Sequence, residues 1–237
     1  MAYTTIDDPS AYFKVQLYSG TGSIQSITFD DTDTTMQPDF VWVKDRESTE
    51  SNTLFDSVRG ATKGIDADAG GTEWTSVNSL TAFGSDGFTV GTGGEVNTSS
   101  DDFVAWCWKE SATAGFDLVG WTGNDTARTI SHSLSAVPHM MIVKNRTSDY
   151  SWNIYHHRNT SAPETDHLVW NTNAATVDSN TRWNDTAPTS SVFTLGTAGS
   201  TNKDTHNFIG YIFTSIQGYS KFGSHTWGTG NADNAFV

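Results

Sequence analysis

The chain has 237 residues, of which 35% are hydrophobic, 12% aromatic and 17% charged, with a formal net charge of −14. Nine tryptophans exclude the aromatic-poor composition of a disordered chain. The negative charge excludes the basic face that nucleic acids and anionic membranes require, so we expect no nucleic-acid partner. No segment approaches 18 apolar residues, so no membrane insertion is expected either.

Many glycine, threonine and asparagine residues beside abundant aromatics indicate strands and turns, so the predicted fold class is all-β. The single cysteine, Cys107, excludes an internal disulfide, and we expect it to be a small buried apolar residue. The amino terminus lacks the pattern of a signal peptide, so synthesis in the cytoplasm is expected.

The first predicted strand lies at residues 13–22, and residues 27–35 (ITFDDTDTT) form a loop rich in aspartate. Clustered carboxylates suit Ca²⁺, but the spacing differs from an EF-hand, so we expect a solvated loop, with bound calcium as the alternative. Further strands are expected at 41–44 and 88–91. A short helix is possible around residues 56–64, and the glycine-rich segment 91–97 is expected to be a hairpin loop.

Residues 103–109 (FVAWCWK) alternate between two apolar faces, which predicts a central strand buried between two layers. Segment 208–213 (FIGYIF) repeats this pattern. The strands expected at 116–124, 141–144 and 193–196 likewise repeat earlier ones, whereas the strand expected at 151–158 has no evident earlier counterpart.

Internal repetition therefore organises the chain. Residues 37–46 resemble 137–146, residues 54–62 resemble 168–176, and residues 87–108 resemble 192–213, in conserved order. We predict two tandem β-sandwich or jelly-roll-like units, at residues 1–112 and 113–216. Residues 217–237 are expected to be the first hairpin of a truncated third unit, which caps the array or docks elsewhere.

Several segments resemble a repeat domain of unknown function from virion proteins of marine tailed bacteriophages; they include PDFVWVKDR, LFDSVRGA, FVAWCWK and YSKFGSHTWGTGN. This resemblance implies a tail-fibre or other structural protein in the virion, with other virion proteins as partners. It also implies a homo-oligomer, a trimer by analogy with phage fibres. The aligned segment of the second unit has Thr-Asn-Ala at 172–174 where the first has Val-Arg-Gly at 58–60, so a function of that motif would occur once.

No catalytic residue, metal ligand or cofactor site is predicted. The acidic residues lie mostly in turn-forming loops, the histidines are scattered, and no nucleophile elbow or phosphate-binding motif occurs. We therefore expect a protein that is not an enzyme, with a glycan-degrading tail enzyme as the weaker alternative.

Tryptophans in predicted loops are the candidate binding residues, because exposed indoles stack on sugar rings and anchor protein interfaces. The candidates are Trp74, Trp183 and Trp227. The alternative is that they pack in the core or between the units. The expected function is host attachment from the virion exterior, with a host surface glycan as the candidate ligand. The alternative is a capsid decoration protein that stabilises the shell.

Overall fold

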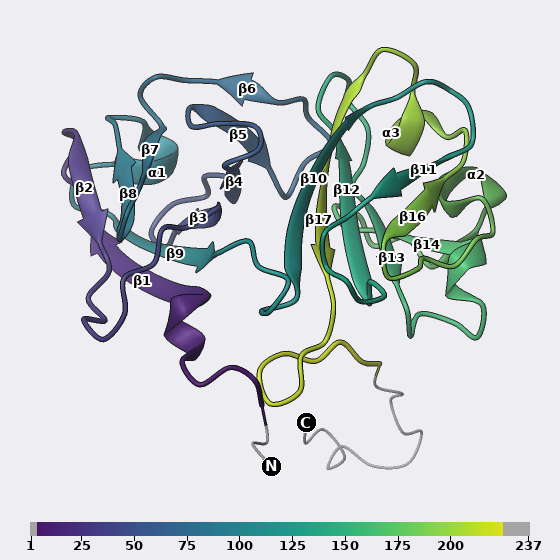
Figure 1. The fold of residues 1–237 in the computed structure, drawn as a ribbon. Coiled ribbons are helices and arrows are strands. Elements are labelled where there is room, and N and C mark those ends of the chain that lie inside the picture. Colours follow the sequence, from purple (N-terminus) through teal and green to yellow (C-terminus); the bar gives the residue numbers. More distant parts are fainter. Residues whose placement is uncertain (1–3, 225–237) are drawn as a thin grey trace, which may run out of the picture.

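The computed structural model describes residues 4–224, which form two large antiparallel sheets, each with a smaller sheet beside it (Figure 1). The first large sheet follows a short 3₁₀ turn, η1 (Pro9–Ala11), and has six strands. In spatial order they are β1 (Phe13–Ser19), β9 (Asp102–Trp108), β3 (Phe40–Asp45), β4 (Thr53–Asp56), β5 (Lys63–Asp66) and β6 (Trp74–Thr75).

The second large sheet has the same strand order, counted from its own first strand. Its strands are β10 (Phe116–Thr122), β17 (Asn207–Phe213), β12 (Met140–Asn145), β13 (Asn153–His156), β14 (Asp166–Val169) and β15 (Val177–Asp178). A 3₁₀ turn, η2 (Pro163–Thr165), precedes β14.

Each large sheet carries a small sheet and one-turn helices on one face. Beside the first lie β2 (Gln25–Thr28), β8 (Gly87–Val90), β7 (Leu80–Gly84) and α1 (Gly94–Asn97). Beside the second lie β11 (Arg128–Ser131), β16 (Val192–Leu195), α2 (Asn180–Trp183) and α3 (Gly199–Asn202). We call these two assemblies the first and the second sandwich. The all-β fold class is confirmed.

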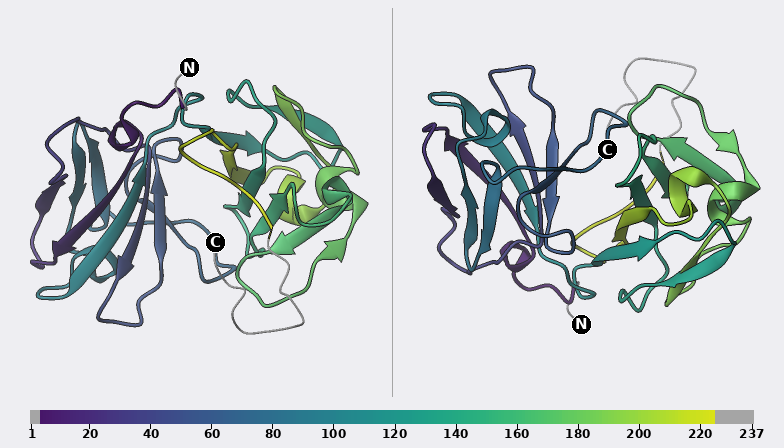
Figure 2. Two further views of the ribbon diagram at one scale, coloured as in Figure 1. Left: turned by 90° about the horizontal axis from the view of Figure 1, so that it is seen from below. Right: turned by 90° about the horizontal axis from the view of Figure 1, so that it is seen from above.

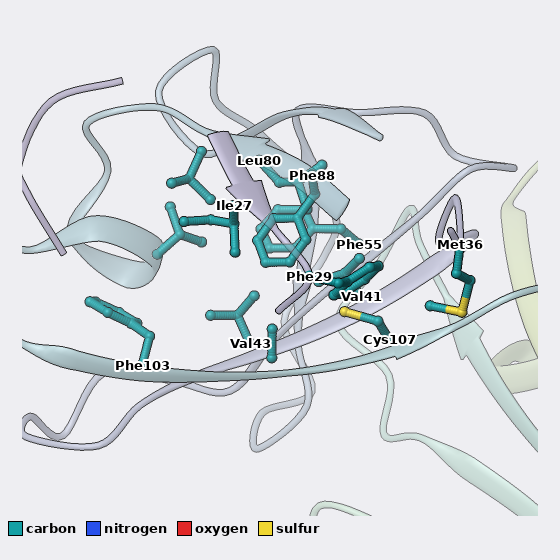
Figure 3. Close-up of a cluster of buried hydrophobic side chains, with 13 residues drawn as sticks. Ile27, Phe29, Met36, Val41, Val43, Phe55, Leu80, Phe88, Phe103 and Cys107 are labelled. Carbon is teal, nitrogen blue, oxygen red and sulfur yellow. The ribbon is translucent and has the colours of Figure 1, made fainter. Parts of the chain in front are cut away.

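An apolar core fills each sandwich. In the first, Ile27 and Phe88 of the small sheet pack with Val41, Phe103 and other residues of the large sheet (Figure 3). The strands β9 and β17 are interior strands, each second from one edge of its sheet and paired on both sides. The alternating apolar faces of 103–109 and 208–213 therefore predicted correctly that these strands are not at an edge.

The two sandwiches pack against each other through the free faces of their large sheets (Figure 2). This interface is a third apolar cluster to which both sheets contribute, with Phe40, Leu54 and Ile65 from the first and Ile142 and Tyr211 from the second. The layers therefore run small sheet, large sheet, large sheet, small sheet. The described residues form one packed body rather than two independent units.

Hydrogen bonding corrects one part of the sequence alignment. Thr53 of β4 pairs with Val43, and Asn153 of β13 pairs with Val143, in the same register. The counterpart of β4 is thus β13 and not residues 168–176, and the strand expected at 151–158 has a partner in the first sandwich after all. The alignment failed because these strands share hydrophobicity and position but almost no residue identity.

Two local expectations need correction. The short helix left open around residues 56–64 does not form, because residues 57–62 make the turns between β4 and β5. Segment 91–97 is not a plain hairpin loop, because it ends in α1, where the Asn97 backbone N–H donates to the Gly93 carbonyl at 2.8 Å.

Most of the predicted third-unit hairpin lies outside the described residues. In the part that the structure describes, Ile216 and Ser220 form an isolated bridge. The described chain contains no helix long and apolar enough to cross a membrane.

Candidate functional site

An apolar cavity of about 330 Å³ lies between the two large sheets. Its walls are mostly aromatic: Tyr12, Phe13, Phe40, Trp42, Trp108, Phe116, Trp170, Tyr211, Phe213, Tyr219 and Phe222. We call it the inter-sheet cavity. A concave apolar site of this kind suits a hydrophobic group of a ligand or of a partner protein.

Strand alternation explains why so many rings meet here. Phe40 and Trp42 on β3 point to the face opposite the first core, and Trp108 on β9 lies in register with Phe40. Phe40 stacks on Trp108 with ring centroids 5.0 Å apart and contacts Tyr211 of the other sheet at 4.6 Å. These rings join the two sheets and leave the cavity beside them.

A buried network of charged groups crosses the interface next to this aromatic cluster. Arg59 is 4% exposed and donates from Nε to the carboxylate of Asp56. The hydroxyl of Tyr211, from the second sandwich, donates to the same carboxylate at 2.9 Å. Arg59 also lies 3.5 Å from Glu73, whose two carboxylate oxygens accept hydrogen bonds from Arg146 at 2.8 and 3.0 Å.

This network assigns a structural role to the Val-Arg-Gly motif at 58–60. The arginine fixes the turn after β4 by donating to the backbone carbonyls of Leu54 and Lys63, at 2.7 and 3.0 Å. The sequence alone drew attention to this motif because it occurs once. It did not indicate that Glu73 and Arg146 would join Arg59. Only the fold brings those residues together.

The loop after β5 is held by side chains of the second sandwich. The indole N–H of Trp152 donates to the carbonyls of Asp66 and Ala69, at 3.2 and 3.1 Å. The fully buried ammonium of Lys144 donates to the carbonyl of Gly70 at 2.6 Å. Burial lowers the pKa of Lys144 to about 8. Of the two lysines that recur at 44 and 144, only Lys144 therefore bonds to the other sandwich, whereas Lys44 donates to carbonyls of its own sandwich.

The structure separates the three candidate tryptophans. Trp183 is 1% exposed and packs in the second core, where its indole N–H donates to the Asp166 carbonyl at 3.0 Å, so its prediction as a surface binding residue was wrong. The loop around it folds into α2, which turns the ring inward. Trp227 lies outside the described residues.

Trp74 is half-buried and lines a second, polar hollow of about 320 Å³. Its ring packs edge-on against Phe55 and lies over Gly64, where an added Cβ would come within 2.2 Å of the indole. The indole N–H donates to Asp66 Oδ1 at 3.3 Å. The Trp74 ring is therefore fixed at the wall of this hollow, and its binding role remains a prediction.

The backbone of the aspartate-rich loop at 27–35 binds the side-chain ammonium of Lys14. Asp31 and Thr34 accept hydrogen bonds from the Lys14 ammonium through their carbonyls. Across residues 4–224 no group of three or more His, Cys, Asp or Glu side chains is arranged to hold a metal ion.

Cys107 is fully buried in the first core, and burial raises the pKa of its thiol, which confirms the expected packing role.

One carboxyl pair stands at the connection between the sandwiches. Glu110 is half-buried, its Oε1 accepts a hydrogen bond from the backbone N–H of Leu118 at 3.5 Å, and the neighbouring carboxyl of Asp117 is 3% exposed. Burial, followed by the hydrogen bond and the charge of Asp117, raises the pKa of Glu110 to about 7. The folded protein therefore favours protonated Glu110.

This pair predicts a pH effect on stability. The pKa of Glu110 is higher in the folded than in the unfolded chain, so its contribution is present at acidic pH and is lost as pH rises from about 4.5 to about 7. With allowance for solvent screening we expect a loss of about 1 kcal/mol in the free energy of unfolding. Glu110→Gln should remove that part of the pH dependence in urea titrations, whereas exposed Glu47→Gln should leave it; equal profiles for both variants would refute the assignment.

Together the fold and these sites define an all-β protein of two packed sandwiches, with an aromatic cavity between them. Residues 8–237 match the family described as "Domain of unknown function (DUF7483)", and the chain belongs to this family. No curated protein and no solved structure matches the chain significantly.

Proposed function

We propose that this protein is a non-enzymatic structural protein of the exterior of a bacteriophage particle, where it contributes to host attachment as part of a tail fibre or spike. The motifs that resemble phage virion proteins support this proposal. The packed double sandwich also suits a structural role, because the aromatic interface and the buried charge network fix the relative position of the two halves.

The observation that carries the proposal is an uncovered apolar strip on the first large sheet. Val15 and Leu17 of β1 are 47% and 57% exposed, on the face that elsewhere packs against the second sandwich. Their neighbour Trp106, in register with Val15, is only half-buried. By contrast Leu118 of β10, the counterpart of Val15 by strand register, is 5% exposed.

This strip lies on an edge strand, because β1 ends the first large sheet. An edge strand with exposed apolar side chains is a template for pairing with another chain. We therefore infer that a second copy of this chain covers the strip, which makes the protein a homo-oligomer. Several copies held in a fixed arrangement would let weak contacts with the host act together.

Replacing Leu17 tests this arrangement. Leu17→Lys should convert the oligomer into monomers in light scattering at micromolar concentration, because a charge would be buried without a partner in the interface. Val177→Lys is the matched control, since Val177 is likewise an exposed apolar residue, at 44%, on the edge strand β15 of the other sheet. A wild-type monomer, or an oligomer that survives Leu17→Lys, would contradict the arrangement.

Capsid decoration is the second candidate, and the same strip favours it if the shell rather than a second copy covers β1. The two functions differ in copy number, since decoration needs hundreds of copies per particle and a fibre needs few. Quantitative mass spectrometry of purified particles measures that number directly.

For the attachment function, the purified oligomer should also compete with particles for adsorption to host cells. Leu17→Lys should compete less well because avidity is lost.

A further inference from the structure

The polar hollow beside Trp74 is an acidic pocket. Its lining consists of Glu50, Ser51, Thr53, Asp66, Trp74, Ser76 and Glu95. Among the described residues, none of its three carboxylates forms a salt bridge with lysine or arginine. An acidic cluster alone does not define a ligand, but the second sandwich shows what the equivalent space contains.

Backbone hydrogen bonds establish which positions are equivalent. The N–H of Ser76 donates to the carbonyl of Thr62, and the N–H of Ser179 donates to that of Thr165, both at 2.8 Å. Downstream, Gly91 donates to the carbonyl of Ser79 at 2.7 Å, as Gly196 does to that of Arg182 at 2.8 Å. Ser79 and Arg182 therefore occupy the same position in the two sandwiches. Thr53 and Asn153 are likewise equivalent, because Thr53 pairs with Val43 as Asn153 pairs with Val143.

In the second sandwich the protein's own guanidinium fills this space. Arg182 is half-buried and donates to Ser179 Oγ at 3.3 Å and to Thr181 Oγ1 at 3.0 Å. It also reaches Asn153 Oδ1 at 3.5 Å. Ser179 and Asn153 are the counterparts of Ser76 and Thr53, two residues that line the acidic pocket. A guanidinium thus fits between these two positions of the fold.

The first sandwich has the space without the guanidinium. Ser79 is fully buried, and its hydroxyl has no hydrogen-bond partner within residues 4–224. Ser79 holds the position of Arg182 but is not among the residues that line the pocket. In the first sandwich, carboxylates line this space. Glu95 is the counterpart of Ser200, because each is the second residue of its one-turn helix, and Asp66 is the counterpart of Val169 by strand register.

The surroundings of Asp66 disfavour its charged form. Burial, together with the charges of Asp68 and Glu95, raises the pKa of this carboxyl despite its hydrogen bonds from Trp74 and Thr53. Those two bonds use Oδ1 and leave Oδ2 available. A cation in the pocket would relieve the repulsion between Asp66 and Glu95.

We propose that the acidic pocket binds a guanidinium group, supplied by an arginine side chain of a partner protein. Carboxylates pair with guanidinium through short, charge-assisted hydrogen bonds, and Trp74 offers an aromatic wall on which its planar group can stack. This site does not depend on the apolar strip at β1 and goes beyond the self-association proposed above. A compact ammonium makes fewer directed contacts, so arginine should bind better than lysine.

Calorimetric titration of the full chain with acetyl-arginine-amide tests the proposal, with acetyl-lysine-amide as the comparison. We expect saturable binding of the arginine compound at millimolar concentration and weaker binding of the lysine compound. Glu95→Gln should weaken arginine binding about tenfold, the loss expected from one charge-assisted pair. Exposed Glu47→Gln, outside the pocket, should leave it unchanged.

Ser79→Arg is the decisive variant, because it gives the first sandwich the arginine that the second already has. It should abolish arginine binding and leave the melting temperature unchanged or higher. If this variant does not fold, the Glu95→Gln and Glu47→Gln pair still decides the outcome. No saturable binding by the wild type, or equal binding by wild type and Glu95→Gln, would overturn the proposal.

Discussion

Arg59→Ala should lower the free energy of unfolding by about 3–5 kcal/mol, the cost of breaking a buried ion pair and leaving one partner uncompensated. The substitution leaves Asp56 fully buried with only the hydroxyl of Tyr211 and a backbone N–H as donors. It also removes one of the two arginines beside Glu73. Urea unfolding followed by tryptophan fluorescence measures the change.

Arg158→Ala is the matched control for this prediction. Arg158 lies in the corresponding turn after β13, is exposed and forms no salt bridge with the described residues. We expect its replacement to change the free energy of unfolding by less than about 0.5 kcal/mol, as for most surface substitutions. Equal effects of the two substitutions would show that the Arg59 network does not stabilise the interface.

Trp152→Ala should have an effect of similar size, a loss of about 3–5 kcal/mol, because it removes a large side chain from a packed core. Trp152 is 1% exposed and also makes the two indole hydrogen bonds to the loop after β5. The variant should therefore make residues 66–70 more accessible, with faster amide hydrogen exchange there than in the wild type.

Trp170 provides the comparison for Trp152. Its ring lies 6.2 Å from that of Trp152 and packs in the same interface, but it is half-buried. Trp170→Ala should cost less and should leave exchange at residues 66–70 unchanged. If both variants alter that exchange equally, the indole bonds of Trp152 are not what holds the loop.

Much of the fold could be predicted because strand patterns are local. The alternation in 103–109 and 208–213 predicted β9 and β17 as interior strands, and the two large sheets have the same strand order, as the repeated motifs led us to expect. The alignment failed where identity was lost, at β4 and β13. Register could be recovered there only from hydrogen bonds, which the sequence does not contain.

The sites were less predictable because they depend on contacts between distant segments. Trp74 and Trp183 both follow turn-rich segments, yet one lines a pocket and the other is core, because a one-turn helix redirects the second. Glu73 and Arg146 join Arg59 only when the two large sheets pack face to face. The guanidinium in the second sandwich likewise becomes informative only once equivalent positions are known.

The same interface explains why one chain can present several surfaces in a fixed arrangement. The aromatic cavity, the apolar strip at β1 and the acidic pocket all belong to or border the first large sheet. That sheet is held in place by Arg59, Trp152 and Lys144. Substitutions that loosen the interface between the sandwiches should therefore also weaken the proposed self-association through the strip at β1.

The proposed place on the particle exterior is tested most directly by immunogold labelling. Purified phage particles from a lysate in which this chain is detected would be incubated with a gold-tagged antibody against the purified protein, and the grains counted by position. We predict a few grains per particle at the tail. Grains spread over the whole head would contradict the attachment function and favour decoration, and unlabelled particles would contradict a place on the virion exterior.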